Sequence, residues 1–228
     1  MYPLITIIII AVAVLVSLGN KWYAVMVLIC GFPLLAILLE WFRGTKARHR
    51  TGRENCLKSF FSLLWSNRAR YGGFVVHIGV ILIALGIIGS SFYSIERTAT
   101  LEVGQSVDVG KYEFTYDNLV LRQGFTKVRA VAEISASKNS HMMGTLYPEY
   151  NYWHSQGESF AEVAVRTAPV DDLFVSMAWT SHDPLDKSAT FRIIVNPLVM
   201  WIWIGGGFML LGGAISFMHP IKLLNAKR

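Results

Sequence analysis

The chain has 228 residues, of which 53% are hydrophobic and 16% are charged, and its mean hydropathy is +0.42. This composition excludes a single ordinary soluble domain and indicates an integral membrane protein. The formal net charge of +6 could suggest a nucleic-acid ligand. The basic residues contain no recognisable nucleic-acid-binding module, however, so we expect no nucleic-acid partner.

Four apolar stretches approach the length of about 20 residues that a helix needs to cross a bilayer. They cover residues 2–18, 22–39, 72–93 and 197–218. The first stretch has no basic segment before it and no small-residue cleavage site after it, so we predict a membrane span and not a signal peptide. Pro33 in the second stretch is expected to kink its helix, which membrane helices tolerate.

The charges predict the orientation of these spans. Of the 21 lysines and arginines, eight lie between the second and third spans and three follow the fourth. Both segments should therefore be cytoplasmic, or on the matrix side in a mitochondrion. The segment between the third and fourth spans holds 13 of the 15 acidic residues. The net charge is thus a signal of membrane topology.

We therefore predict an α-helical integral membrane protein with four transmembrane helices and an inserted small all-β extracytoplasmic domain, either a barrel or a sandwich. The expected parts are two transmembrane helices in 1–40, a basic cytoplasmic loop in 41–72, a transmembrane helix in 73–93, the β-domain in 94–195, a transmembrane helix in 196–218 and a cytoplasmic tail in 219–228. Both termini would be cytoplasmic, with the β-domain periplasmic in a bacterium.

Within the basic loop, residues 55–67 place apolar side chains at helical spacing. This pattern predicts an amphipathic helix that lies on the inner membrane face or packs on the protein's own cytoplasmic ends. The two cysteines, Cys30 and Cys56, both fall outside the β-domain. We expect no disulfide in that domain and no thiol exchange by this chain.

The outer segment changes to the alternating pattern of β-strands. Strands are predicted at 98–103, 112–116, 128–134, 161–165, 172–179 and 189–194, with glycines between them. The aromatic segment 146–157 lacks a regular pattern and is interpreted as a long loop or edge. Its aromatic side chains could cover the domain's core, or face a partner or lipid headgroups.

His77 is the one histidine at membrane depth, inside the apolar run that follows Arg68 and Arg70. An ionisable side chain in a membrane span is costly, and its default explanation is functional. Imidazole is well suited to bind a buried iron, so His77 is our candidate cofactor-binding and metal-ligating residue, with no catalytic residue assigned.

At about 100° per residue, Gly79, Gly86 and Ser90 fall on one side of this helix and Gly73 and His77 on nearly the opposite side. The helix can pack closely along its small residues while it presents His77 to another neighbour or a cofactor. Haem carboxylates could lie near Arg68 and Arg70, although these arginines also suit a simple role as membrane anchors.

The order and spacing of several segments resemble the C-terminal part of the CcmF family, whose relatives include CycK and NrfE. These segments are 39–48, 70–79 with 86–90, 146–149, 161–165, 172–175 and 196–207. The resemblance implies assembly of c-type cytochromes, in which haem as substrate arrives on the chaperone CcmE and is attached to an exported apocytochrome c. It also implies a structural b-type haem held by two histidines, of which His77 matches the C-terminal one.

The resemblance leaves a gap, because the partner histidine and the tryptophan-rich haem-handling segment of the family have no match in this chain. The chain is therefore expected to act as a subunit of a cytochrome c haem lyase, together with an N-terminal CcmF-like chain and proteins of the CcmH and CcmI type. A methionine such as Met26, Met200 or Met209 could instead supply the second ligand.

The remaining histidines match no motif of the family. They are His49, His141, His154, His182 and His219, and we expect them to be solvated. Two other functions stay open on the sequence alone: a membrane scaffold without enzymatic activity that binds assembly partners through the β-domain, and a transporter subunit for haem or another solute.

Overall fold

The computed structural model describes residues 5–6, 8–10, 12–13, 27–52, 58, 66–154, 157–179 and 187–218. The chain divides into two compact units, a helical one formed by residues 1–88 and 201–228 and a β-rich one formed by residues 89–200. Most of the predicted first span, the greater part of the predicted amphipathic helix in 55–67 and the predicted tail lie outside the described residues.

Three described helices are long and apolar enough to cross a membrane. They are α3 (Phe32–Gly52), which follows a short π-helical turn η1 (Val27–Gly31), α5 (Arg68–Phe92) and α6 (Val199–Phe217). The π-helical turn ends two residues before Pro33, which has no N–H to donate to the preceding turn. Helix α3 continues for a dozen residues beyond the predicted end of the second span, because no glycine–proline break interrupts its basic end.

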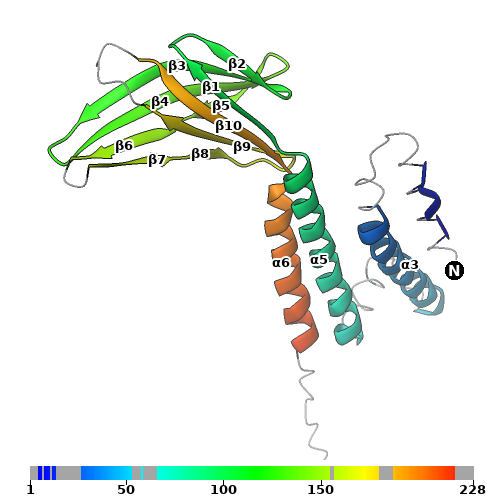
Figure 1. Ribbon diagram of the computed structural model, residues 1–228. Helices are drawn as coiled ribbons and strands as arrows, with labels where there is room; N and C mark the ends of the chain where they lie inside the picture. Colours follow the sequence, from blue (N-terminus) through cyan, green and yellow to red (C-terminus); the bar gives the residue numbers. More distant parts are fainter. Residues whose placement is uncertain are drawn as a thin grey trace, which may run out of the picture. The chain divides into compact units, whose positions relative to one another are not determined.

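The described residues of the β-unit form ten strands. They are β1 (Ile95–Leu101), β2 (Ser106–Val109), β3 (Tyr112–Gln123), β4 (Lys127–Lys138), β5 (His141–Leu146), β6 (Glu149–Trp153), β7 (Glu158–Glu162), β8 (Ala164–Arg166), β9 (Asp171–Ala178) and β10 (Ala189–Pro197). One sheet has the order β1-β10-β9-β8, and the other has the order β2-β3-β4-β6-β7 with β5 also on β4. The two sheets form a sandwich, which decides between the two architectures that the sequence left open (Figure 1).

Five of the six predicted strands are present as single strands, whereas the predicted strand 161–165 is divided at Val163 between β7 of one sheet and β8 of the other. The interpretation of residues 146–157 as a loop or edge is wrong. Residues Glu149–Trp153 form β6, an inner strand that pairs with β4 on one side and β7 on the other. Pro148 obscured this strand in the sequence. Its carbonyl oxygen accepts a hydrogen bond from Ala132 N of β4 at 3.0 Å. The hydrogen bonds along β4 therefore continue between its pairing with β5 and its pairing with β6.

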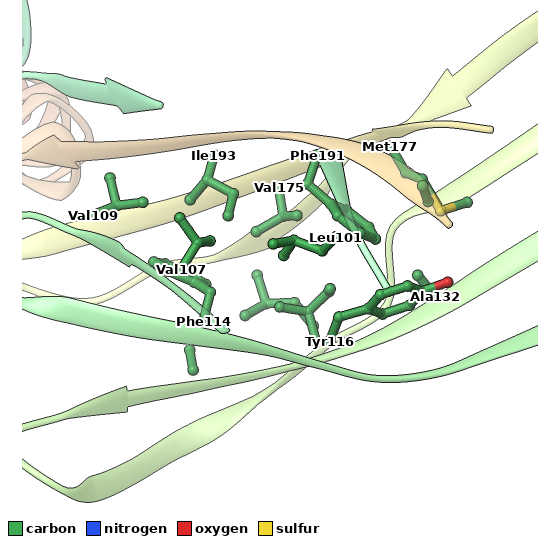
Figure 2. Packing of buried hydrophobic residues seen from close by; sticks show 14 of the residues in the cluster. Leu101, Val107, Val109, Phe114, Tyr116, Ala132, Val175, Met177, Phe191 and Ile193 are labelled. Carbon is green, nitrogen blue, oxygen red and sulfur yellow. The ribbon is translucent and has the colours of Figure 1, made fainter. Parts of the chain in front are cut away.

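The core of the sandwich lies between the sheets. Figure 2 shows side chains from facing strands pointing toward one another, among them Phe114 and Tyr116 from β3 and Phe191 and Ile193 from β10. These four side chains have no exposed surface. The rings of Tyr116 and Phe191 meet edge to face with centroids 4.8 Å apart, an arrangement that adds to the free energy gained by burial. The alternation of buried and exposed residues in β3 and β4 explains why these segments could be predicted as strands.

The turn between β4 and β5 has the geometry of a tight hairpin. Asn139 and Ser140 both have positive φ, 50° and 64°, as a two-residue turn of the left-handed kind requires. Asparagine tolerates this region better than most residues. The second strand of this hairpin, β5, begins with His141. This histidine, one of those considered in the sequence, therefore lies at an exposed strand end.

Candidate functional site

His77 lies in the middle third of α5, and its side chain is exposed on the helix surface. Its Nδ1 lies 2.7 Å from the carbonyl oxygen of Gly73, one turn earlier. A carbonyl can only accept, so Nδ1 carries the proton and donates it. In the neutral imidazole Nε2 is then the unprotonated nitrogen, the form that binds a metal ion.

Gly73 leaves open space beside His77. A Cβ atom placed on Gly73 would meet nothing within 4 Å. The two residues are four apart in the helix and therefore share one face. The imidazole thus borders a stretch of helix surface that carries no side chain of its own.

The opposite side of α5 packs closely against α6. A Cβ on Gly79 would lie 2.6 Å from the carbonyl oxygen of Gly205, and one on Gly212 would lie 2.7 Å from that of Gly72. Such distances leave no room for any side chain, so glycine is required at these crossing points. The predicted close packing along the side of Gly79 is confirmed, with α6 as the neighbour (Figure 1).

Helix α3 contacts α5 on a further side. Cys30 of η1, Ile37 of α3 and Ile81 of α5 form a small buried cluster, with Phe74 and Ile78 packed against it. The three helices therefore leave the surface around His77 exposed, while the sides next to it are covered.

Arg70 lies two turns before His77 and is bound by a carboxylate of α3. Its Nη2 donates to Glu40 Oε1 at 2.7 Å, and its guanidinium lies 5.9 Å from the centre of the Phe74 ring. Arg68 instead donates from Nη1 to the carbonyl oxygen of Met218 at 3.2 Å, just after the end of α6. A cation at a helix C-terminus is stabilising, so Arg68 has a structural role of its own.

The sequence reasoning missed Glu40 as a partner of Arg70. A signal was available, because Glu40 is one of two acidic residues before position 94 and stands at the end of a predicted span. A carboxylate at such a position is expected to have a cationic partner.

Met209 lies on the wrong side of α5 to be a second ligand beside His77. A Cβ on Gly79 would be 2.7 Å from Met209 Cγ, so Met209 packs at the glycine contact. Met26 lies outside the described residues, and Met200 belongs to the β-unit.

The other histidines form no site in the described parts of the chain. His49, His141 and His154 are exposed, and His154 stacks edge to face on Tyr152 at 5.7 Å. His182 and His219 lie outside the described residues. The described residues hold no group of three or more His, Cys, Asp or Glu side chains placed to bind a metal ion.

An apolar pocket of about 440 Å³ lies among the helices and does not include His77. Its lining residues are Trp41, Val75, Ile204, Gly207, Phe208, Leu211 and Ile215. A second, polar pocket of about 280 Å³ lies on the β-unit, where the carboxylate of Glu149 binds Arg129 through two hydrogen bonds. The hydrogen bond from Arg129 lowers the pKa of Glu149.

A second electrostatic cluster of the β-unit is centred on Asp171. Its Oδ2 lies 2.7 Å from Lys111 Nζ and accepts a hydrogen bond from the Tyr112 hydroxyl at 2.8 Å. Burial raises the pKa of the Asp171 carboxyl, but the hydrogen bonds from Lys111 and Tyr112 outweigh that effect and hold it below its usual value. Burial and the nearby carboxylate raise the pKa of Tyr112 to about 12. We call these three residues the Asp171 clasp.

The chain is similar to known proteins in its fold and in its sequence. The fold resembles a solved structure titled "Cytochrome c Heme Lyase CcmF", with a TM-score of 0.66 and 22% identity over 94% of this chain and 34% of that chain. The fold is thus that of a β-sandwich inserted in sequence between helices that are long and apolar enough to cross a membrane. Residues 92–197 match the family described as the CcmF C-terminal beta-sandwich.

Named relatives agree with that match. The CcmF protein of Haemophilus influenzae is 29% identical over 80% of this chain and 27% of its own length, and the NrfE protein of the same organism is 28% identical over 94% and 36%. The CcmF protein of Pseudomonas aeruginosa is 31% identical over 65% and 22%. Residues 92–197 therefore belong to the CcmF C-terminal β-sandwich family, and the chain as a whole is similar to the C-terminal part of CcmF and NrfE proteins. It spans 22% to 36% of the length of these relatives.

Proposed function

We propose that this chain is a membrane subunit of the machinery that matures c-type cytochromes, and that His77 is one axial ligand of a b-type haem. The second ligand would come from a partner chain that corresponds to the N-terminal part of the family. The relatives are named as cytochrome c-type biogenesis proteins, which supports the general role. The orientation of His77 is the observation that carries the ligand assignment.

The residues around His77 fit a haem in three respects. The bond from Nδ1 to Gly73 fixes the ring and leaves Nε2 for the iron. The open surface at Gly73 provides clearance for a flat macrocycle beside the helix. No side chain among the described residues is recorded as bonded to Nε2, so no existing hydrogen bond of these residues has to be broken.

Arg70 is placed to bind a carboxylate of the same haem. It lies seven residues before His77, which corresponds to about 10 Å along the helix axis and nearly the same face. The Arg70 guanidinium is half exposed and already pairs with Glu40, so it has donors left for a second carboxylate. Arg70 would then join Glu40 to the carboxylate of the cofactor.

A bound haem would supply a redox-active iron in the membrane. The contribution of this chain would be to orient the imidazole through Gly73, to compensate a carboxylate through Arg70 and to keep the site dry through the apolar surface of α5. The covalent attachment of haem to an apocytochrome would need the tryptophan-rich segment of the partner chain.

The same proposal includes the location of the subunit in the membrane and its partner proteins. It would lie in the bacterial inner membrane, or the mitochondrial one in a eukaryote, with both termini on the cytoplasmic or matrix side and the β-sandwich in the periplasm. The haem chaperone CcmE, proteins of the CcmH and CcmI type and apocytochrome c would be its partners.

The test is to co-express the chain with the N-terminal partner, purify the complex and record oxidised and reduced haem spectra. His77→Ala should lose most of the b-type haem signal while the two chains still co-purify. His141→Ala is the matched control, because His141 is an exposed histidine on β5, and it should retain the signal. An unchanged haem content in His77→Ala would refute the ligand assignment and favour the scaffold function.

A second variant separates ligation from folding. Gly73→Leu introduces a side chain where the chain itself has free space, so the helices should assemble normally. The leucine would occupy the clearance beside His77 and should lower haem content by tenfold or more, about 1.4 kcal/mol or more in affinity. Haem retained at the wild-type level in Gly73→Leu would show that the cofactor does not approach this face.

A further inference from the structure

The sandwich has two sides at which edge strands of the two sheets come together. We call the side at β1 and β2 the closed side and the side at β7 and β8 the open side. On the closed side, the edge strands β1 and β2 of the two sheets contact each other. Arg97 of β1 donates from Nη1 to the carbonyl oxygen of Asp108 in β2 at 2.7 Å. This bond uses an edge carbonyl that would otherwise face solvent, so these two edges protect each other.

The open side is formed by β7 and β8, which Val163 joins into one continuous edge from residue 158 to 166 (Figure 1). Within the described residues, β7 pairs only with β6, and β8 pairs only with β9. Each strand therefore presents one row of backbone N–H and C=O groups to which no described strand is paired.

Strand β7 is exposed on both faces as well as along its edge. All five of its residues are exposed, including Ser159 and Ala161, which lie on the same face as the core-packed Tyr150. Large apolar side chains are exposed along the same edge, with Phe160 at 51%, Val163 at 51% and Val165 at 50%. Natural proteins usually cover or blunt such edges, so exposed apolar residues here indicate a docking surface.

The outward face of β7 has a defined charge pattern. Glu158, Phe160 and Glu162 alternate along the strand and pair in register with Trp153, Asn151 and Glu149 on β6. Asn151 donates from Nδ2 to Glu162 Oε1 at 2.9 Å and holds that carboxylate on this face. Residues 158–165 contain no lysine or arginine. A strand laid beside β7 would therefore meet an acidic, an apolar and an acidic side chain in turn.

We propose that the β7–β8 edge binds an extended segment of a partner polypeptide by β-strand addition, and that this segment carries basic, apolar and basic residues at alternate positions. Backbone hydrogen bonds to β7 supply affinity. Glu158 and Glu162 select the basic residues, and Phe160 selects the apolar one, because directly opposed side chains on neighbouring strands lie about 5 Å apart.

The test uses the full chain in nanodiscs of zwitterionic lipid and a fluorescent peptide with the sequence Gly-Lys-Val-Ile-Val-Lys-Gly, blocked at both ends. Polarisation should show saturable binding. Glu158→Lys should weaken binding of this peptide about two- to fivefold and strengthen binding of the peptide in which both lysines are glutamate. Asp108→Lys, the same charge change on the closed side, should leave the affinity for both peptides nearly unchanged.

Two N-methylated peptides distinguish strand addition from side-chain docking. One peptide is methylated on the amides of one edge and the other on the amides of the opposite edge. Strand addition requires that one of them binds like the parent peptide and the other does not bind. Equal binding of both, equal effects of Glu158→Lys and Asp108→Lys, or no binding of the parent peptide up to about 1 mM would overturn the proposal.

A further variant tests the apolar contact without disturbing the fold. Phe160→Ser removes an exposed ring from β7 and should weaken binding of the parent peptide at least as much as Glu158→Lys does. The circular dichroism spectrum should stay that of the wild type. Unchanged affinity in Phe160→Ser would also contradict the proposal, because the apolar position of the peptide would then have no counterpart.

Discussion

The helical unit and the β-unit bury their side chains in different ways. The sandwich encloses a continuous core in which Phe114, Phe191 and Ile193 are fully buried. In the helical unit, the only buried residues of α6 are Gly205 and Gly212, and Trp203 and Leu210 are more than three-quarters exposed. The sandwich thus has the core of an independent domain, whereas the helices need lipid or further helices to cover them.

This difference indicates where each unit tolerates change. The sandwich is stabilised by side chains that fill its core, so deletion of buried atoms lowers its free energy of unfolding. In the helix pair, stability comes from close approach of two backbones, so addition of atoms is costly. The following experiments, given in order of decreasing effect, test that contrast.

The largest effect is expected from removal of a core ring. Phe191→Ala deletes a fully buried side chain that packs on Tyr116 and should lower the free energy of unfolding of the β-unit by about 3–5 kcal/mol. The measurement is urea unfolding of the full chain in detergent, followed by the circular dichroism of the strands. Phe125→Ala changes a fully exposed phenylalanine and should cost less than about 0.5 kcal/mol. Similar losses in both variants would contradict the core described here.

A smaller effect is expected from one added methyl group between the helices. Gly79→Ala places a Cβ 2.6 Å from the Gly205 carbonyl oxygen and should destabilise the α5–α6 pair by about 1–3 kcal/mol. Gly73→Ala adds the same atom on the same helix into open space and should be neutral or slightly stabilising. Thermal unfolding of the helices in detergent compares the two variants. If Gly73→Ala were the more damaging change, the helix pairing would be wrong.

The smallest effect concerns the Asp171 clasp and the pH dependence of stability. The pKa of Tyr112 is raised from its ordinary value of 10 to about 12, so the folded state favours the neutral phenol. Its contribution is fully present below pH 10 and is lost as the pH rises from 10 through about 12. Tyr112→Phe should cost about 1 kcal/mol at neutral pH and should flatten this alkaline loss.

Urea unfolding of the wild type and of Tyr112→Phe across that pH range measures the difference. Tyr147→Phe, at a half-exposed tyrosine of the same unit, is the control and should follow the wild type. An alkaline loss of equal size in Tyr112→Phe would assign it to another group.

Sequence reasoning succeeded where one local pattern determines the structure. Alternation in 112–116 and 128–134 predicted the core strands β3 and β4, because every second residue in the middle of each strand is buried. Helical periodicity placed Gly79 and His77 on opposite sides of one helix, and the structure has α6 on the first side and open surface on the second.

The sequence was less informative where contacts between residues far apart in the chain determine the structure. Strand β6 alternates weakly, because Asn151 is 1% exposed although it lies on the outward face, where it binds Glu162. The position of Glu40 predicted a cationic partner, but no local pattern could select Arg70, thirty residues later, as that partner. Long-range contacts can override local preference in this way.

The two ends of the sandwich lie next to each other in the sheet. Ile95, near the end of α5, is paired in register with Val195, close to the start of α6, and directly paired strands hold their Cα atoms about 5 Å apart. Leu198, with a φ of 62°, makes the last turn and donates its N–H to the carbonyl oxygen of Val170 at 2.8 Å. The segment 95–197 therefore enters and leaves the sheet at directly neighbouring positions. Exchanging it between relatives would leave the lengths of α5 and α6 unchanged, as successful domain insertions require.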